Sequence, residues 1–256
     1  MSAAFAAESP WIRRAARPGA TIRLFCFPYA GVGASAFRDW PERLPDTVEV
    51  VAVQLPGRED RTKEQLPADV PTLARRCALA LLPYTTMPFA LYGHCAGGLV
   101  AYEVAQELRA RGARSPELLL AAAHPAPHRQ RNREPVHELP DDKFVEALRG
   151  MGGAPEAVLA NDDFLDFLLP VMRADFALFE NYRDSGRPPL DCPITTVCGD
   201  SDAIIGLDEC DGWAEHTTGQ FGRITVEGGH YFVHDLTPAS AEALAGALLT
   251  SPAPTR

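Results

Sequence analysis

The residues from Gly93 to Gly97 form the pattern G-x-C-x-G, with Cys95 at its centre. A short apolar run precedes this pattern and a segment with helical spacing follows it. That is the setting of a nucleophile elbow, usually written G-x-S-x-G, in which a tight turn lifts a nucleophile off the sheet. Free N–H groups at the start of the helix stabilise negative charge there. We predict that Cys95 is a nucleophile; the alternative is a buried cysteine in a glycine-rich turn.

A nucleophile of this kind needs a base, and the base needs a group that orients it. In proteins with this elbow the chain order is nucleophile, acid, histidine. His230 directly follows one apolar run and is the predicted base, with His234 as the alternative. Asp202 follows another apolar run and is the predicted acid, with Asp200 as the alternative. The remaining histidines that we consider are expected to be surface or loop residues: His94, His124, His128 and His137.

An oxyanion hole requires two backbone N–H groups. One comes from the residue after the nucleophile, here Ala96, and the second from the loop after an earlier strand. The loop F-P-Y-A-G-V-G follows the first strong apolar run, and its Ala30 is the predicted donor. Tyr29 is the alternative donor, and an ordinary turn rich in small residues is the alternative interpretation of the loop.

The elements that must position these residues follow from the apolar pattern. Strands are predicted over residues 22–28, 48–53, 89–92, 117–123, 193–198 and 222–227. Helices are predicted over residues 68–82, 97–112 and 236–249. Continuous apolar strands that alternate with helices indicate an α/β fold with a mostly parallel sheet flanked by helices. We expect a single domain over residues 1–256, with loosely held tails at 1–20 and 250–256.

The alternation stops between residues 128 and 187, where helical patterns continue but no clear strand is predicted. An insertion of this length on the side of the functional loops is more often a functional element than a plain connection. We therefore predict that residues 128–187 form a helical lid within the single domain.

Composition excludes several classes of function. The 24 Lys and Arg against 34 Asp and Glu give a net charge of −10 without a dense basic run, which argues against nucleic-acid binding. No apolar stretch approaches the length of a membrane helix, and the N-terminus lacks the order of a signal peptide. The six cysteines include no C-x-x-C pair. We expect six reduced thiols, no metal site and a cytoplasmic location.

Several motifs taken together resemble the type II thioesterases of polyketide and nonribosomal-peptide assembly lines. The similarity lies in FPYAGVGAS, QLPGREDR, YGHCAGGLVAYEVA, GDSD and EGGHYF, and it extends over residues 20–248. The resemblance implies an α/β-hydrolase fold with a helical lid and a triad of Cys95, Asp202 and His230. It also implies hydrolysis of acyl or aminoacyl thioesters from the phosphopantetheine arm of a carrier protein, in editing or release.

That resemblance has consequences for partners. The partner would be an acyl or peptidyl carrier protein, and because the phosphopantetheine arm belongs to it, no cofactor is expected in this chain. We expect a monomer. Arg129, Arg131 and Arg133 open the predicted lid and are hypothesised to meet an acidic carrier domain or the phosphate of the arm. Unchanged carrier affinity after charge reversal at these arginines would refute that hypothesis.

The sequence departs from the family pattern at the nucleophile. Cys95 stands where the family has serine, and Val32 replaces the second glycine of the usual A-G-G turn. Three explanations for the cysteine compete. It is a natural nucleophile, it is a deliberate Ser-to-Cys change, or it marks a related enzyme whose reaction has a different product. Because acyl exchange between two thioesters is nearly isoenergetic, an acyl or aminoacyl transferase that shuttles groups between carriers is the first alternative. A non-catalytic carrier-binding protein is the second.

Overall fold

A single eight-stranded sheet in the order β1-β2-β4-β3-β5-β6-β7-β8 organises the chain in the computed structural model. The structure describes residues 5–132, 135–152 and 159–250. The strands β3 to β8 run parallel to one another, and β1 and β2 join the sheet edge in antiparallel fashion. The bounds of the strands are β1 Ala6–Ser9, β2 Ile12–Arg14, β3 Ile22–Phe27, β4 Val48–Val53, β5 Phe89–His94, β6 Leu118–Ala122, β7 Ile194–Gly199 and β8 Phe221–Val226.

Alternating side chains of the central strands enter two separate cores. In β3, Phe25 and Phe27 pack on one face of the sheet, whereas Leu24 and Cys26 pack on the other. All of these side chains are fully buried. A strand buried on both faces is continuously apolar, which is why the sequence pattern predicts a covered parallel sheet. The predicted fold class, an α/β fold with a mostly parallel sheet, is confirmed.

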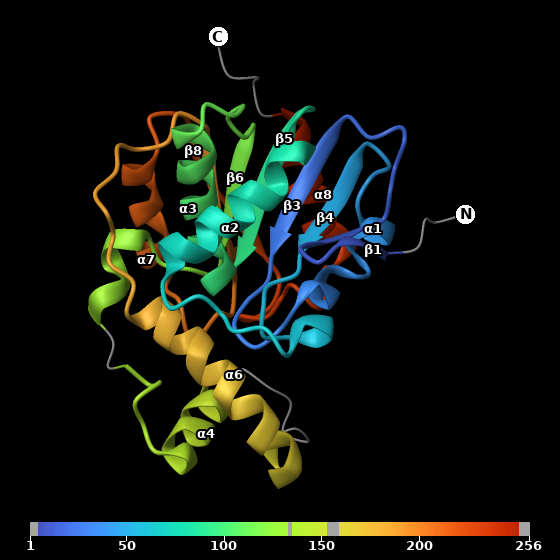
Figure 1. Cartoon of the computed structure of the whole chain (residues 1–256). Coiled ribbons are helices and arrows are strands. Elements are labelled where there is room, and N and C mark those ends of the chain that lie inside the picture. Colours follow the sequence, from blue (N-terminus) through green and yellow to red (C-terminus); the bar gives the residue numbers. More distant parts are fainter. Residues whose placement is uncertain (1–4, 133–134, 153–158, 251–256) are drawn as a thin grey trace.

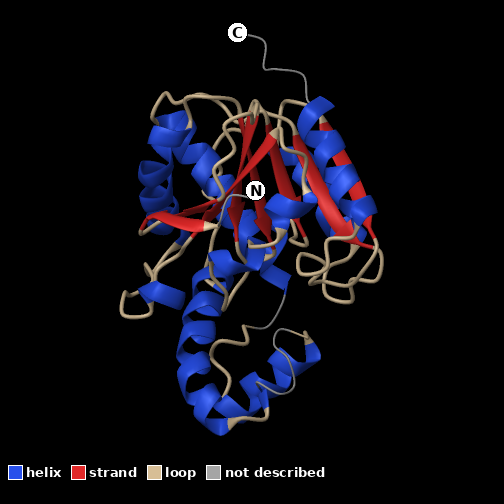
Figure 2. Ribbon diagram, turned by 90° about the vertical axis from the view of Figure 1, so that its right-hand side faces the viewer, coloured by secondary structure: helices blue, strands red, loops and turns tan. Residues whose placement is uncertain are grey.

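Helices cover both faces of the sheet (Figures 1 and 2). Figure 1 shows α2 (Val70–Leu81) and α3 (Ala96–Ala110) in front of the sheet, with α8 (Pro238–Thr250) behind it. The shorter helices are α1 Trp40–Arg43 and α7 Leu207–Asp211, with 3-10 turns at Ala34–Phe37, Glu59–Arg61, Leu82–Tyr84, Pro127–Asn132 and Gly212–His216. The amphipathic α2 begins at the cap Asp69, whose side chain accepts a hydrogen bond from Thr72 N.

The strand order places a switch point between β3 and β5. The chain runs from β3 outward to β4 and then returns to the opposite side of β3 to form β5. Phe27 at the end of β3 pairs with Gly93 in β5. Loops that leave two such neighbouring strands diverge at their carboxyl ends, where open α/β sheets bind ligands. The fold therefore brings the loop with Ala30 beside the turn with Cys95.

Helices α4 (Asp141–Gly150) and α6 (Asp162–Glu180) lie between β6 and β7 in the chain and project beyond the carboxyl ends of the strands (Figure 1). They pack on each other through a small apolar cluster that includes Phe144, Leu148 and Met172. Within the described part of residues 128–187 the chain forms no strand. That this segment acts as a lid stays a prediction.

Two expectations about local structure were wrong. Residues 5–20 are not loosely held along their length, because β1 and β2 pair with each other and β2 pairs with β4. The expected tail at 250–256 lies almost wholly outside the described residues. The strand predicted over 89–92 continues through Gly93 and His94, because parallel pairing with β6 extends to His94.

In the described ranges, no helix combines the length and apolar character needed to cross a membrane.

Candidate active site

Cys95 occupies a strained turn between β5 and α3. Its backbone has φ 50° and ψ −125°, a conformation that L-residues rarely adopt. Its N–H donates to Ala122 O over 2.7 Å, and its carbonyl accepts from Gly98 N over 2.8 Å. These bonds hold the turn against β6 and the first turn of α3. The Cys95 side chain is half-buried and lines a cavity.

The two glycines of the motif allow this turn to pack closely. A Cβ at Gly93 would lie 2.1 Å from Gly97 O, and a Cβ at Gly97 would lie 2.3 Å from Phe27 O. Both obstacles are backbone atoms, which cannot rotate away. The spacing G-x-C-x-G therefore has a steric cause, because a side chain at either glycine would collide with the backbone.

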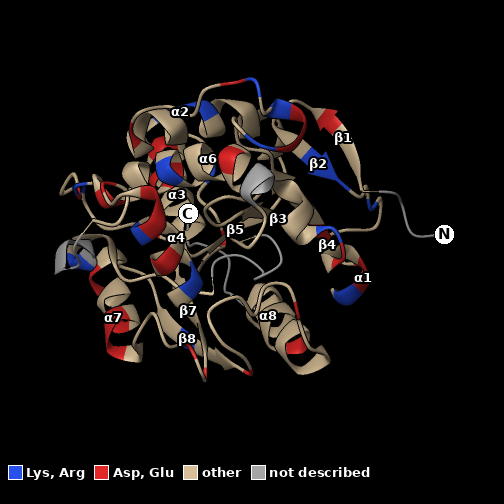
Figure 3. Cartoon of the chain, turned by 90° about the horizontal axis from the view of Figure 1, so that it is seen from below, with Lys and Arg blue, Asp and Glu red and all other residues tan. Residues whose placement is uncertain are grey.

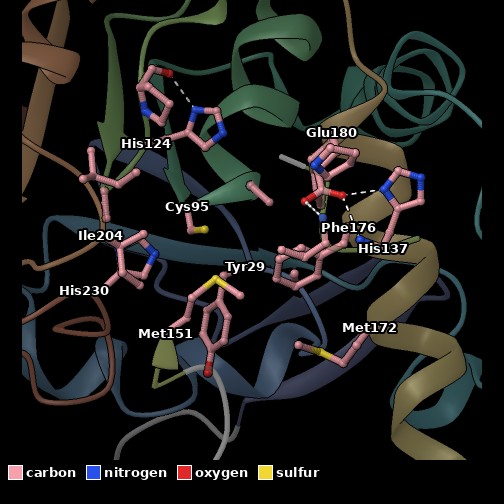
Figure 4. Close-up of a pocket in the computed structure, with 18 of the residues that line it drawn as sticks. Tyr29, Cys95, His124, His137, Met151, Met172, Phe176, Glu180, Ile204 and His230 are labelled. Carbon is pink, nitrogen blue, oxygen red and sulfur yellow. Dashed lines mark hydrogen bonds and ion pairs between the residues drawn. The ribbon is translucent and has the colours of Figure 1, made fainter. Parts of the chain in front are cut away.

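His230 and Asp202 meet beside the elbow. The distance from His230 Nδ1 to Asp202 Oδ2 is 2.9 Å, and the side chains are 5% and 2% exposed. The other Asp202 oxygen, Oδ1, accepts from the backbone N–H groups of Ile204 and Ile205. His230 and Cys95 line the same cavity. The structure thus brings together the three residues predicted as nucleophile, acid and base, from loops after β5, β7 and β8. Figure 4 shows Cys95 and His230 at the cavity.

The environment shifts the pKa values of this pair in opposite directions. Burial is the largest influence on the pKa of His230 and lowers it, but the hydrogen bonds and charges of Asp202 and Cys95 together raise it from 6.5 to about 9. Burial raises the pKa of Asp202, yet its hydrogen bonds to His230, Ile205 and Ile204 and the charge of His230 lower it overall. An anionic Asp202 therefore faces a histidine that is a stronger base than a free imidazole.

The alternative acid and base lie elsewhere. Asp200 is exposed, and its carboxylate accepts from the backbone N–H of Gly228 over 3.0 Å. His234 is exposed and pairs through Nε2 with the hydroxyl of Tyr29. His230 lines the cavity that holds Cys95, whereas His234 does not, and the carboxylate bonded to His230 is that of Asp202. These contacts favour Asp202 and His230 for the predicted roles.

Both predicted oxyanion donors line the same cavity as Cys95. Ala96 is the first residue of α3, so its N–H has no partner within the helix. Ala30 lies in the loop after β3, and its neighbour Tyr29 also lines the cavity. The Tyr29 side chain extends to His234. Gly31, the residue after Ala30, has φ 83°. The oxyanion role of these N–H groups stays a prediction.

The cavity has a volume of about 570 Å³ and two kinds of wall. Next to Cys95 and along α6 it is apolar, with Met151, Met172 and Phe176 among its lining residues (Figure 4). Toward the end of α6 it is polar, where His137 Nδ1 pairs with Glu180. An acyl chain fits the apolar part, whereas the polar part suits hydrogen-bonding groups.

The expectation that the remaining histidines are surface or loop residues was wrong for His94. This residue ends β5 and is fully buried. Burial, followed by the charge of His230, lowers the pKa of His94 to about 3, so its ring is neutral. Nε2 can then donate to His230 O over 2.8 Å while Nδ1 accepts from the Tyr92 hydroxyl over 3.1 Å. His94 thus ties the backbone of the predicted base to the strand before the elbow.

The other three histidines lie in loops or at the surface, as expected. His124 is a buried loop residue that lines the cavity, and His137 lines it too. His128 is exposed, and its Nδ1 lies 2.8 Å from His216 Nε2. The local sequence does not reveal the contacts of His128 and His137, because their partners His216 and Glu180 lie far away in the chain.

Five of the six cysteines differ from Cys95 in their surroundings. All six are free thiols, and all except Cys95 are buried. Cys26, Cys77 and Cys198 lie in β3, α2 and β7, where sequence analysis placed them. Among the described residues, no cluster of three or more His, Cys, Asp or Glu side chains could hold a metal ion.

Replacement of Asp202 tests which carboxylate orients the base. We expect Asp202→Asn to lower kcat for thioester hydrolysis about 10²- to 10³-fold, because His230 loses its anionic partner. The matched change Asp200→Asn should leave kcat within about threefold, since its carboxylate is exposed and accepts a hydrogen bond from Gly228 N. Steady-state kinetics on both variants decide the question, and the reverse order of effects would assign the acid to Asp200.

Charge on His230 should also link stability to pH. The pKa of His230 is about 9 in the folded chain, whereas the ordinary pKa of histidine, which applies to the unfolded chain, is 6.5. The folded chain therefore binds this proton more tightly than the unfolded chain. The contribution is fully present below pH 6.5 and is lost as pH rises to about 9. We expect the free energy of unfolding in urea to fall by about 2–3 kcal/mol across this range. His230→Asn should lack this component; an unchanged pH profile in that variant would contradict the prediction.

Comparison with known proteins agrees with the fold. The chain has the architecture of the α/β-hydrolase class, with an elbow, an acid and a histidine in the order of that class. Residues 22–248 match the model of the thioesterase domain family, and the chain belongs to this family. The predicted resemblance to type II thioesterases is confirmed, and the protein is a thioester hydrolase.

Individual relatives are similar along nearly their whole length. Thioesterase PikA5 of Streptomyces venezuelae is 36% identical, with 88% of this chain and 80% of the relative covered. The structure of RedJ, a thioesterase of the prodiginine pathway in Streptomyces coelicolor, is 40% identical with a TM-score of 0.83, covering 93% and 92%. The type II thioesterase BorB of the borrelidin cluster is 35% identical with a TM-score of 0.84, covering 95% and 99%.

Proposed function

We propose that this thioesterase hydrolyses acyl or aminoacyl thioesters from the phosphopantetheine arm of an acyl or peptidyl carrier protein, as an editing or release enzyme of an assembly line. The observation that carries the proposal is that Cys95 and His230 line one cavity, while Asp202 is bonded to His230 Nδ1. Relatives named for the prodiginine and borrelidin pathways support the assembly-line context.

The first half of the reaction forms an acyl-enzyme. His230 takes the proton of Cys95, and Asp202 stabilises the imidazolium that results. The thiolate attacks the thioester carbonyl, and the N–H groups of Ala96 and Ala30 hold the oxyanion. The carbon–sulfur bond to the arm then breaks, and the departing thiol receives the proton from His230.

The second half releases the acid. His230 removes a proton from water, and the resulting hydroxide attacks the Cys95 thioester. When the tetrahedral intermediate collapses, the bond from the carbonyl carbon to Cys95 breaks, the carboxylic acid leaves, and the Cys95 sulfur takes back the proton from His230. Every proton is moved by groups of this chain, so we propose that the reaction needs no resident cofactor or metal. The arm arrives with the carrier.

Arg129 is the part of the proposed carrier contact that the structure describes. Its side chain is exposed, lines the cavity and donates to Asp208 O over 2.8 Å. The side chains of Arg131 and Arg133 lie outside the described residues. In Figure 3, acidic and basic segments are interspersed on the side of α4 and α6, so a local contact rather than net charge would guide an acidic carrier.

The test uses a carrier loaded with an acyl group and intact-mass detection of both carrier and enzyme. Wild type and Cys95→Ser should both release free acid, and a second, unloaded carrier should remain unacylated. Acyl transfer to the second carrier without free acid, lost in Cys95→Ser, would overturn hydrolysis in favour of shuttling. Equal kcat/KM for the loaded carrier and for a short acyl-pantetheine would overturn the carrier as the recognised partner.

A further inference from the structure

A buried ion pair joins helix α6 to the loop that follows β4. Arg58 Nη2 donates to both carboxylate oxygens of Asp175 in α6. The Asp175 side chain is 3% exposed and the Arg58 side chain is 4% exposed. Arg58 belongs to the motif QLPGREDR, which sequence analysis singled out but to which the triad gives no role. The proposed catalytic steps therefore give no role to this ion pair.

Asp175 also holds the loop that contains Ala30. Its Oδ2 accepts a hydrogen bond from Gly31 N over 2.6 Å. One helical turn earlier, Met172 packs over the same glycine, where a Cβ would lie 2.0 Å from Met172 Sδ. Residues three apart share one face of a helix, so this face of α6 contacts the loop directly after the predicted oxyanion donor.

Stability alone explains this ion pair poorly. Removing two charges from water offsets most of their attraction, and well-packed apolar residues often replace buried pairs without loss. Arg58 Nε is moreover buried without a hydrogen-bond partner among the described residues. What an apolar pair could not supply is a fixed anionic acceptor for Gly31 N. A charge-assisted hydrogen bond of this kind holds the backbone in one orientation.

We propose that Asp175, held by Arg58, is a positioning residue that orients the loop 29–31, so that the N–H group of Ala30 points at the developing oxyanion. This inference rests on the proposed function, because the oxyanion role of Ala30 belongs to it. Preorganised donors are effective only when they are fixed before the reaction. The seating of α6 on the loop is then a condition for stabilising the transition state.

Two double variants separate positioning from stability. Arg58→Met with Asp175→Leu removes both charges and the acceptor but keeps the volume filled. We expect it to remain folded, with a midpoint of thermal unfolding at or above that of wild type, while kcat falls about 10- to 100-fold. Arg58→Gln with Asp175→Asn keeps an oxygen acceptor for Gly31 N and should recover most of kcat.

A pair of inhibitors provides a readout that a merely structural role would not move. An acyl-pantetheine trifluoromethyl ketone forms a tetrahedral adduct with Cys95, whereas the corresponding thioether binds without reaction. In the Met/Leu variant, affinity for the ketone should fall by the same factor as kcat/KM, and affinity for the thioether should change less than about threefold. Wild-type kcat in that variant, or equal loss of affinity for both inhibitors, would overturn the inference.

Failure of the proposed function is distinguishable from failure of this inference. Wild-type enzyme that forms no ketone adduct, together with full activity in Cys95→Ala, would overturn the proposed function before any change at Asp175. If the Met/Leu variant fails to fold, Asp175→Asn alone is compared with the Gln/Asn variant. A higher kcat in the latter and unchanged thioether affinity in both support the inference, and loss of thioether affinity in both overturns it.

Discussion

Cys95→Ala should reduce the rate of thioester hydrolysis by about 10⁴-fold or more, because it removes the nucleophile while leaving the cavity intact. The small side chain fits the turn, since the backbone bonds to Ala122 and Gly98 do not involve the thiol. Residual hydrolysis would come from the N–H groups and from substrate binding alone. The measurement is release of free acid from an acyl thioester, with intact-mass detection of acyl-enzyme.

Cys95→Ser is the matched control. It restores an atom that can accept an acyl group, and the downhill step to an oxygen ester favours its formation. We expect free acid and a detectable ester intermediate from this variant. Turnover by Cys95→Ala within about tenfold of wild type would remove Cys95 from the mechanism and leave the cavity and the histidine to be explained in another way.

Gly93→Ala should prevent stable folding. The added Cβ would lie 2.1 Å from Gly97 O and 2.5 Å from the Cα of Gly98, and neither obstacle can rotate away. We expect the free energy of unfolding to fall by about 4 kcal/mol or more, which exceeds the effect of most single substitutions. Thermal unfolding followed by circular dichroism measures it.

Gly246→Ala is the control for that change. Gly246 lies inside α8, and a Cβ there would have no atom within 4 Å. Replacement of an unobstructed helical glycine should stabilise the protein by about 0.5–1 kcal/mol. If Gly93→Ala is as well tolerated as Gly246→Ala, then close packing of the elbow on α3 is not what requires glycine.

The central sheet and the core of the site could be predicted because their signals are local. A strand such as β4, apolar at nearly every position, indicates burial on both faces of the sheet. The G-x-C-x-G pattern indicates a tight turn in which the flanking residues must be glycine. Asp202 and His230 could be placed because each directly follows a strand, and the carboxyl ends of parallel strands meet at one edge.

Other features depend on partners that no local pattern reveals. The strand β1 has the sequence Ala-Ala-Glu-Ser, and its residues are largely exposed at the sheet edge, so it lacks an apolar signal. Glycine weakens a strand prediction, which is why β5 seemed to stop before Gly93. The burial of His94 requires Tyr92 and the carbonyl of His230. Likewise Arg58 and Asp175 meet only because α6 returns to the loop after β4.

The hydrogen bond from His94 to the carbonyl of His230 joins positions 136 residues apart in the chain. Contacts between distant parts of a chain form late, because the intervening segment must first be ordered. The elbow can form from β5, α3 and β6, yet it acquires its histidine only when β8 has paired with β7 at the sheet edge. A chain still emerging from the ribosome therefore carries the Cys95 thiol without the proposed base, His230. On the proposed mechanism, enzymatic activity in this protein requires that the last strand, β8, has docked.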